Sequence, residues 1–314
     1  MKFDTISIGE AMAEFSPTPS DNPDETGSYQ LGWGGDTSNV VVGLSRLGKK
    51  VGYITQVGDD ELGHGLLNMW KDNNVDTTKV KISKDGWTGL YLVSLLDRGH
   101  RDFTYFRKGS AASLLRPSDL DLKYLKSTRV LHVSGIGQAI SKSCRDSIDR
   151  AITIVRENDG LISYDPNIRT KLLPLEEIKK IVFDTLPLVD ILLPSIDDAV
   201  LLYGRKTASE LTRRLLSKGP KVVAMKMGVN GCIVGAASGK NYRIRGHPVH
   251  SIDTTGAGDA FDAGFLASYL DGDDVVSSAA TGNFVAALKV QQLGATKGLP
   301  TLTEVKNFSE GKQP

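Results

Sequence analysis

Short apolar stretches alternate with longer amphipathic ones along this 314-residue chain, and this alternation constrains the fold more than any other feature. Several of the short stretches are apolar at consecutive positions, which is typical of parallel strands buried on both faces. The predicted strands are 4–9, 51–58, 129–135, 161–167, 190–195, 221–228 and 231–236. The predicted helices are 37–48, 60–73, 143–158, 174–186, 196–202, 207–218, 259–271 and 274–290. Strands that alternate with helices in this way predict an α/β protein with a mostly parallel central sheet.

One region, residues 87–107, interrupts this pattern with "WTGLYLVSLLDRGHRDFTYFR", which predicts two strands around the turn "DRGHRD". Alternation with a period of two groups five side chains by face: Phe103, Tyr105 and Arg107 on one strand, and Tyr91 and Val93 on the other. A hairpin inserted into a parallel α/β chain is more often a flap or an interface than part of the core. We therefore expect a small lid here, together with the irregular segment 11–35.

The composition and the missing motifs exclude several classes of protein. The 38 basic and 37 acidic residues give a net charge of +1, so neither a nucleic-acid partner nor a membrane surface is expected. The two cysteines are far apart and lack metal-ligand spacing, which favours a reducing compartment. No apolar run approaches the roughly 18 residues that span a bilayer, and the N-terminus is a poor signal peptide, so a cytoplasmic protein is expected. Neither a P-loop nor a complete G-x-G-x-x-G is present, which argues against a P-loop NTPase and against a Rossmann dehydrogenase.

The stretch Asp253–Phe265, "DTTGAGDAFDAGF", places Gly256 and Gly258 directly before an acid, Asp259, at the predicted start of a helix. Backbone N–H groups at a helix N-terminus favour anions, and glycine lets them approach a ligand without obstruction by a Cβ atom. Asp259 is expected to stay ionised beside the helix dipole, where it can accept the proton of an attacking hydroxyl. The N–H groups of the loop, that of Ala257 included, would stabilise the transferred charge, so the pattern predicts phosphoryl transfer to an alcohol. A glycine-rich turn with an acid at a helix start is the alternative interpretation.

Two motifs carry a resemblance to a known family. "DTTGAGDAFDAGFL" (253–266) resembles the C-terminal signature of the PfkB, or ribokinase-like, family of sugar kinases, and "GGDTSNVVVGLSRLG" (34–48) resembles its N-terminal signature. The resemblance covers essentially the whole chain. It implies one kinase domain, 1–314, with a ribokinase-like three-layer α/β/α fold, a mostly parallel central sheet and a small β-sheet lid at about 11–35 and 87–107. It also implies ATP as co-substrate, Mg²⁺, and a homo-oligomer formed through the lid.

The substrate side resembles one branch of that family. "FTYFRKGSAAS" (103–113) and "YDPNIRTKLLP" (164–174) are similar to the 2-keto-3-deoxygluconate kinase branch, in which tyrosines and arginines hold the carboxylate and hydroxyls of a sugar acid. The substrate-binding residues implied by position are Gly34, Tyr91, Tyr105, Arg107, Arg169 and Asp259. The planar fork of arginine matches a carboxylate geometrically. Arg107 could instead be a lid-edge arginine in water, and Arg169 could cap its strand or contact ATP phosphates.

On the nucleotide side, "VVAMKMGVNG" (222–231) resembles the K-x-G-x-x-G turn of the family. The resemblance places Lys226 and Gly228 near the ATP phosphates, Gly231 at the turn, and Asn283 at the adenine pocket. The full set implied for ATP is Asn167, Ser195, Lys226, Gly228, Gly231, Gly256, Gly258 and Asn283. A strand-end role for the lysine and a merely solvated role for Asn283 remain open.

The sequence departs from the family after the strand at 190–195. The family commonly has N-x-x-E there, whereas this chain has Ser195 and Asp198. The shorter carboxylate of Asp198 can still hold a hydrated Mg²⁺ through water, because Mg²⁺ keeps several of its waters. Ser195 followed three residues later by an acid also fits a helix cap, and the two roles can coexist.

The function expected from these residues is ATP-dependent phosphorylation of the terminal hydroxyl of a 2-keto-3-deoxy sugar acid, first of all 2-keto-3-deoxygluconate, to its 6-phosphate. Asp259 would be the base, and Gly256, Ala257 and Gly258 would supply the N–H donors. A kinase for a neutral sugar, of the fructokinase or ribokinase type, is the alternative. A non-catalytic sugar-binding protein on the same scaffold is a further one, although such a protein has no physical need for the base.

Overall fold

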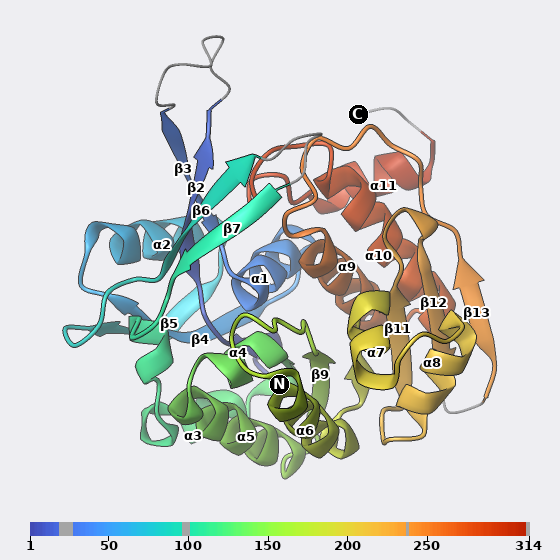
Figure 1. Ribbon diagram of the computed structural model, residues 1–314, viewed down its shortest axis with the longest axis horizontal. Coiled ribbons are helices and arrows are strands. Elements are labelled where there is room, and N and C mark those ends of the chain that lie inside the picture. Colours follow the sequence, from blue (N-terminus) through green and yellow to red (C-terminus); the bar gives the residue numbers. More distant parts are fainter. Residues whose placement is uncertain (19–27, 96–100, 237–238, 312–314) are drawn as a thin grey trace.

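The computed structural model describes residues 1–18, 28–95, 101–236 and 239–311 (Figure 1). Its centre is a nine-stranded sheet in the order β13-β12-β11-β10-β9-β8-β1-β4-β5. The strands are β1 (Phe3–Ile8), β4 (Val51–Gly58), β5 (Asp76–Ser83), β8 (Thr128–Ser134), β9 (Leu161–Asp165), β10 (Ile191–Leu192), β11 (Val222–Lys226), β12 (Cys232–Ala236) and β13 (Asn241–Ile244). All neighbouring pairs from β5 to β11 are parallel, whereas β12 and β13 add to the edge as antiparallel strands.

Helices cover both faces of this sheet (Figure 1). They are α1 (Asp36–Arg46), α2 (Glu61–Asp72), α3 (Leu122–Leu125), α4 (Gly135–Ile140), α5 (Lys142–Arg156), α6 (Leu175–Thr185), α7 (Ile196–Tyr203), α8 (Ala208–Leu216), α9 (Ala257–Asp271), α10 (Val275–Lys289) and α11 (Leu302–Ser309). One apolar cluster contains buried residues of α1, α2, α9 and α10, and the other contains those of α5 to α8. Successive residues of a strand enter different clusters, as Tyr53 and Ile54 do in β4, because side chains alternate across a sheet. The fold is therefore a three-layer α/β/α sandwich.

A second sheet of four strands, the lid sheet, stands apart from the central one (Figure 1). Its order is β3 (Tyr29–Gly34), β2 (Met12–Pro17), β6 (Leu90–Leu95) and β7 (Arg101–Phe106). The predicted alternation is confirmed: Tyr91 pairs with Tyr105 and Val93 with Phe103, and these four side chains pack together with Met12 on one face.

The predicted strands and helices are all present, but the sequence interpretation was wrong at the segment 11–35. It was expected to be irregular, whereas β2 and β3 make half of the lid sheet. Residues 19–27, within that segment, and 97–100 of the predicted turn lie outside the described residues. The edge strand β5 was missed because its half-exposed "DTTKVKIS" carries charges at positions that a buried strand would fill with apolar residues. None of the helices in the described part of the chain is long and apolar enough to cross a membrane.

Candidate active site

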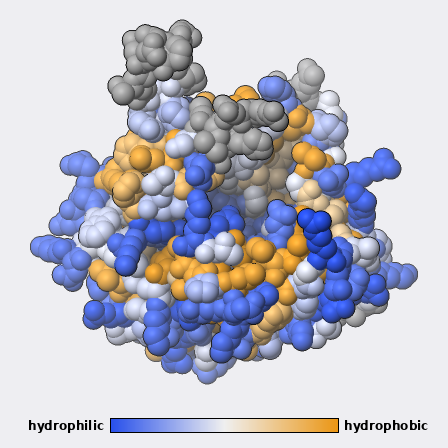
Figure 2. Space-filling model, in the orientation of Figure 1, coloured by the Kyte–Doolittle hydropathy of each residue, from blue (hydrophilic) through white to orange (hydrophobic). Residues whose placement is uncertain are grey.

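A cavity of about 840 Å³ lies between the lid sheet and the carboxyl ends of the parallel strands. The space-filling view shows the recess below the lid, with hydrophilic residues inside it (Figure 2). Its walls come from the ends of β9 and β11, from the N-termini of α1, α7 and α9, and from β6 and β7 of the lid sheet. In open α/β sheets the carboxyl ends of the strands are where ligands bind. Chain segments that are far apart in the sequence therefore meet around one cavity.

The loop before α9 and the first residues of that helix, 253–259 together, are suited to bind an anion, and we call this segment the anion loop. Gly256 has φ of 76°, and a Cβ atom there would lie 3.1 Å from the Ala295 carbonyl oxygen, so this turn requires glycine. The first rung of the helix joins the Ala260 N–H to the Gly256 oxygen at 2.9 Å. The N–H groups of Gly258 and Asp259 precede that rung and point out of the helix N-terminus. The predicted donor Ala257 is instead used inside the turn, where its N–H donates to the Thr254 oxygen at 3.1 Å.

Asp259 lies in the cavity wall and is 8% exposed. Its Oδ2 accepts a hydrogen bond of 2.7 Å from Nδ2 of Asn39 on α1. Burial and the neighbouring carboxylate of Asp36 raise the pKa of Asp259 to about 7, against the opposing effects of Asn39 and Lys226. The expectation of an ionised acid considered only the helix dipole, whereas burial acts in the opposite direction and raises the pKa. A carboxyl group with a pKa near neutrality is suited to accept a proton at physiological pH.

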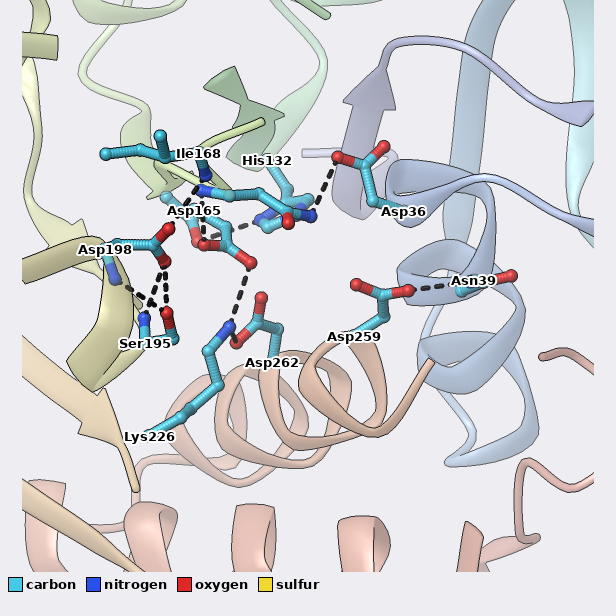
Figure 3. A network of polar contacts seen from close by, with 12 residues as sticks. Asp36, Asn39, His132, Asp165, Ile168, Ser195, Asp198, Lys226, Asp259 and Asp262 are labelled. Carbon is cyan, nitrogen blue, oxygen red and sulfur yellow. Dashed lines mark hydrogen bonds and ion pairs between the residues drawn. The ribbon is translucent and has the colours of Figure 1, made fainter. Parts of the chain in front are cut away.

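Lys226, predicted to contact ATP phosphates, lies between two carboxylates (Figure 3). Its Nζ is 2.9 Å from Oδ2 of Asp165 and 2.8 Å from Oδ1 of Asp262. Burial acts to lower the pKa of Lys226, but the two carboxylates raise it above its ordinary value. A Cβ atom on Gly258 would lie 3.6 Å from Nζ, so the ammonium lies beside the anion loop. The lysine lines the cavity and two acids already balance its charge, so its contact with ATP phosphates stays a prediction.

Ser195 and Asp198 form a capping box at the start of α7. Ser195 donates to Oδ2 of Asp198 through both its N–H, at 2.9 Å, and its hydroxyl, at 2.7 Å, while Oδ1 of Asp198 accepts from Ile168 N–H at 2.8 Å. The helix-cap interpretation is therefore confirmed. Burial first, and then the carboxylate of Asp165, raises the pKa of Asp198.

Asn167 lines the same cavity. It has φ of 37°, and its Nδ2 donates to a carboxylate oxygen of Asp36 at 3.3 Å.

The cavity offers carboxylates to a metal ion, but no preformed cage. Among the described residues, no group of three His, Cys, Asp or Glu side chains could hold a metal ion. Asp165 and Asp198 nevertheless line the cavity close to the anion loop. One or two carboxylates with waters and substrate phosphates are the ordinary ligands of Mg²⁺. These residues thus fit an Mg²⁺ ion that arrives with a nucleotide.

Arg107 is a buried arginine and not a lid-edge residue in water. It is 8% exposed and forms an ion pair with Glu10. Its guanidinium carbon Cζ lies 5.4 Å from the centre of the Tyr105 ring. Glu10 is itself 1% exposed and accepts a second hydrogen bond, of 2.8 Å, from the hydroxyl of Ser110. The Arg107 side chain lines the cavity, but its charge is balanced by a carboxylate that the sequence analysis did not identify, and its contact with a substrate stays a prediction.

Of the other predicted substrate residues, Tyr91, Tyr105 and Arg169 line the same cavity, whereas Gly34 is not among its lining residues. Tyr91 and Tyr105 line the cavity, and the Tyr91 hydroxyl donates to Glu14. Gly34 lies against that tyrosine, because a Cβ atom on it would be 2.4 Å from the hydroxyl oxygen. Arg169 is exposed at the cavity, and its Nη1 donates to the neighbouring Ile168 oxygen at 3.1 Å.

Three residues predicted to bind ATP are not among those that line this cavity. Gly228 and Gly231 belong to the turn between β11 and β12. Asn283 is 6% exposed on α10, where its Nδ2 donates to the Arg245 oxygen at 3.1 Å. It is therefore not a solvated helical asparagine, and its role at an adenine pocket stays a prediction.

Besides Glu10, the sequence analysis missed four polar residues of the site: Asp36, Asn39, Asp165 and Asp262. Asp36 and Asn39 lie inside the N-terminal signature, in "GGDTSN" (34–39), and Asp262 follows Asp259 by one helical turn. Side chains three residues apart on a helix lie on the same face, so that spacing was an available signal. Only the packing of α1 against α9 shows that Asn39 reaches Asp259 (Figure 3).

Comparison with known proteins agrees with this geometry. Residues 2–302 match the pfkB family of carbohydrate kinases. The chain is 34% identical to the 2-dehydro-3-deoxygluconokinase of Bacillus subtilis (strain 168), and the match covers 98% of this chain and 96% of that protein. It is 32% identical to Probable fructokinase-2 of Arabidopsis thaliana, and this match covers 96% of this chain and 94% of that protein. A ribokinase II-type protein of E. coli, solved in complex with ATP and Mg²⁺, has a TM-score of 0.91 at 29% identity and covers 98% of this chain and 99% of that one. The chain therefore belongs to the pfkB family of carbohydrate kinases.

Proposed function

We propose that the protein, as one kinase domain, transfers the γ-phosphoryl group of Mg·ATP to the terminal hydroxyl of a 2-keto-3-deoxy sugar acid, first of all 2-keto-3-deoxygluconate. The phosphoryl-transfer part of this proposal is supported by the position of Asp259. The carboxyl of Asp259, whose pKa is near 7, belongs to the last residue of the anion loop and lies beside the N–H groups of a helix N-terminus. A base and an anion site are thus held next to each other.

In the proposed reaction Asp259 removes the proton of the acceptor hydroxyl as its oxygen forms a bond to the γ-phosphorus. The bond from that phosphorus to the bridging oxygen breaks, and ADP leaves. The N–H groups of Gly258 and Asp259 stabilise the charge on the transferred group, and donors of this kind contribute roughly 10²–10³ in rate. Asn39 holds the base in place through its hydrogen bond. Mg²⁺ neutralises phosphate charge, and Asp165 and Asp198 would hold it through water.

The sugar-acid part of the proposal rests on arginine and tyrosine side chains that line the same cavity. Arg169 is exposed at the cavity and can meet a carboxylate as a bidentate partner. Arg107 and Tyr105 can donate to hydroxyl groups of the acceptor, whereas Tyr91, whose proton goes to Glu14, can only accept. The 2-dehydro-3-deoxygluconokinase of Bacillus subtilis, named for the same substrate under its other name, supports this choice.

A neutral-sugar kinase is the second candidate, and a specific contact favours it. Glu10 already balances the charge of Arg107, so this arginine offers a carboxylate less attraction than an unpaired guanidinium would. The similarity to an Arabidopsis protein named as a fructokinase points the same way.

The test is an assay of ATP consumption with Mg²⁺ over 2-keto-3-deoxygluconate, its galactonate epimer, gluconate, fructose and ribose. Turnover confined to the keto-deoxy acids supports the proposal, and loss of that preference in Arg169→Met would identify the carboxylate contact. Turnover of fructose or ribose alone would refute the sugar-acid part and leave the kinase chemistry intact. If none of the five is phosphorylated, both the sugar-acid and the neutral-sugar candidates are refuted.

We also propose a cytoplasmic homo-oligomer that associates through the outer face of the lid sheet. An apolar groove of about 710 Å³ lies there, lined by Phe15, Trp87, Leu90, Leu92 and Phe106. Trp87 and Phe106 are 55% and 50% exposed, and a patch of this kind on a sheet face is typical of an interface. Light scattering would show a multiple of 33.9 kDa that falls toward the single-chain mass in Trp87→Glu; a single-chain mass throughout would refute it. The two buried free cysteines agree with a reducing compartment.

A further inference from the structure

Lys289 is a fully buried lysine, and neither the proposed mechanism nor the family motifs assign it a role. It ends α10 with 0% exposure and is among the largest completely buried side chains of the described residues. Burial of an ammonium group is costly unless it is paired and hydrogen-bonded, so such a side chain requires a physical reason. An apolar residue of the same length would fill the space without that cost.

The ammonium of Lys289 lies beneath the start of the anion loop. Nζ donates to the main-chain oxygen of Asp253 at 2.9 Å and is 4.0 Å from Oδ2 of the same residue. Asp253 is the first residue of the anion loop and is 1% exposed. The lysine thus connects the C-terminal end of α10 to the point where the loop begins.

The carboxylate of Asp253 in turn accepts hydrogen bonds from backbone N–H groups, one of them in the anion loop. Its Oδ1 accepts from Thr255 N–H at 2.8 Å, and its Oδ2 accepts from Gly294 N–H at 2.8 Å. Burial acts to raise the pKa of Asp253, but Lys289 and these N–H groups bring it below its ordinary value. A second anchor holds the same place, because the N–H groups of Ile252 and Asp253 donate to the Val290 oxygen at 2.7 and 3.0 Å. Those two bonds need no charge, so the ammonium is not required merely to attach the segment.

The neighbourhood of the loop explains what a further positive charge can do. Lys226 beside Gly258 is balanced by Asp165 and Asp262, so it supplies little net positive charge to a phosphate. An ammonium that donates to the Asp253 carbonyl polarises the peptide group that opens the loop, and chains of hydrogen bonds strengthen one another in a low-dielectric interior. It also limits the movement of that peptide group, and transition-state stabilisation by N–H groups requires them to be preorganised.

We propose that Lys289 is a positioning residue for phosphoryl transfer: its buried ammonium holds the Asp253 carbonyl and thereby fixes the N–H groups of the anion loop on the transferring phosphate. The proposal depends on kinase activity and not on the identity of the sugar. It predicts a loss of rate in the chemical step, with acceptor affinity left in place.

The test uses Lys289→Met, which keeps the length of the side chain and removes its charge. Val285→Ala, on the same helix and 0% exposed, is the control for a loss of packing. The double variant Asp253→Asn/Lys289→Met avoids a buried carboxylate that has lost its lysine, and it keeps the test possible if the single variant fails to fold. For each protein, kcat and the acceptor KM are measured well below the melting temperature, and kcat is divided by the folded fraction. The acceptor is the one that the assay panel identifies, so a wrong guess of the sugar leaves this test intact.

Lys289→Met is expected to lower kcat by about 10²-fold, the range for loss of one preorganised donor, with the acceptor KM within about threefold of the original. Val285→Ala should lower the melting temperature and keep kcat. The double variant should regain the melting temperature and not the rate. The proposal is overturned if the methionine variant keeps kcat within threefold, or if the double variant regains rate and stability together, because Lys289 would then only neutralise a buried acid.

Discussion

Replacing Asp259 by asparagine should abolish most of the activity and, at the same time, stabilise the fold. The substitution removes a buried negative charge and keeps the size of the side chain. Nδ2 of Asn39 can still donate to the amide oxygen of the new residue, so little of the local geometry needs to change. The two effects have one origin, because the surroundings that make the carboxyl a base also make its ionised form costly.

The size of the stabilisation follows from the pKa. The pKa of Asp259 rises from an ordinary value of 3.8 to about 7, and one pKa unit corresponds to about 1.36 kcal/mol. A carboxyl whose pKa is higher in the folded state binds its proton more tightly there, so ionisation destabilises the fold. This destabilisation is absent below pH 3.8, grows between pH 3.8 and 7, and reaches about 4 kcal/mol at higher pH. Asp259→Asn should thus raise the free energy of unfolding by about 2–4 kcal/mol at pH 8 and by only about 1–1.5 kcal/mol at pH 5.

Urea denaturation at pH 5 and pH 8, together with kcat at pH 8, measures both effects. Loss of a general base typically costs about 10²–10⁴ in kcat. Asp184→Asn is the control for removal of a charge, because that side chain is 66% exposed on α6 and should change stability by less than about 0.5 kcal/mol. A variant that keeps kcat within tenfold would remove Asp259 as the base. An equal stability gain at both pH values would refute the raised pKa.

Three further outcomes are expected. The kcat of the unaltered protein should rise with pH and level off above about pH 7 as Asp259 ionises, and a flat profile between pH 5.5 and 8.5 would contradict this. Arg107→Met leaves Glu10 buried without its cation and should cost about 3–5 kcal/mol of stability in urea denaturation, with partial recovery when Glu10→Gln is added; an unchanged denaturation midpoint would show that the pair is not needed. Ser195→Ala removes the capping hydroxyl that donates to Asp198 and should lower the free energy of unfolding by about 1 kcal/mol, whereas a loss of ATP binding without that decrease would favour a nucleotide contact.

The α/β class, the predicted strands and helices, the two faces of the lid hairpin and the anion loop could all be recognised from the sequence alone. These features are local. Strand β4 is apolar along its whole length, the lid strands alternate with a period of two, and Gly256 needs a φ value that other residues rarely adopt. Patterns of this kind are set by neighbours within a few residues, so they can be recognised without the fold.

Tertiary structure alone decided the charge states and pairings of the site. The pKa of Asp259 depends on burial and on Asp36, which is 223 positions away in the sequence. Arg107 finds Glu10 at a separation of 97 residues, and Lys289 meets Asp253 at a separation of 36. Desolvation and charge pairing depend on which distant segments exclude water around a group. No local pattern records that arrangement, because it arises only when the helices pack on the sheet and the lid sheet closes over its edge.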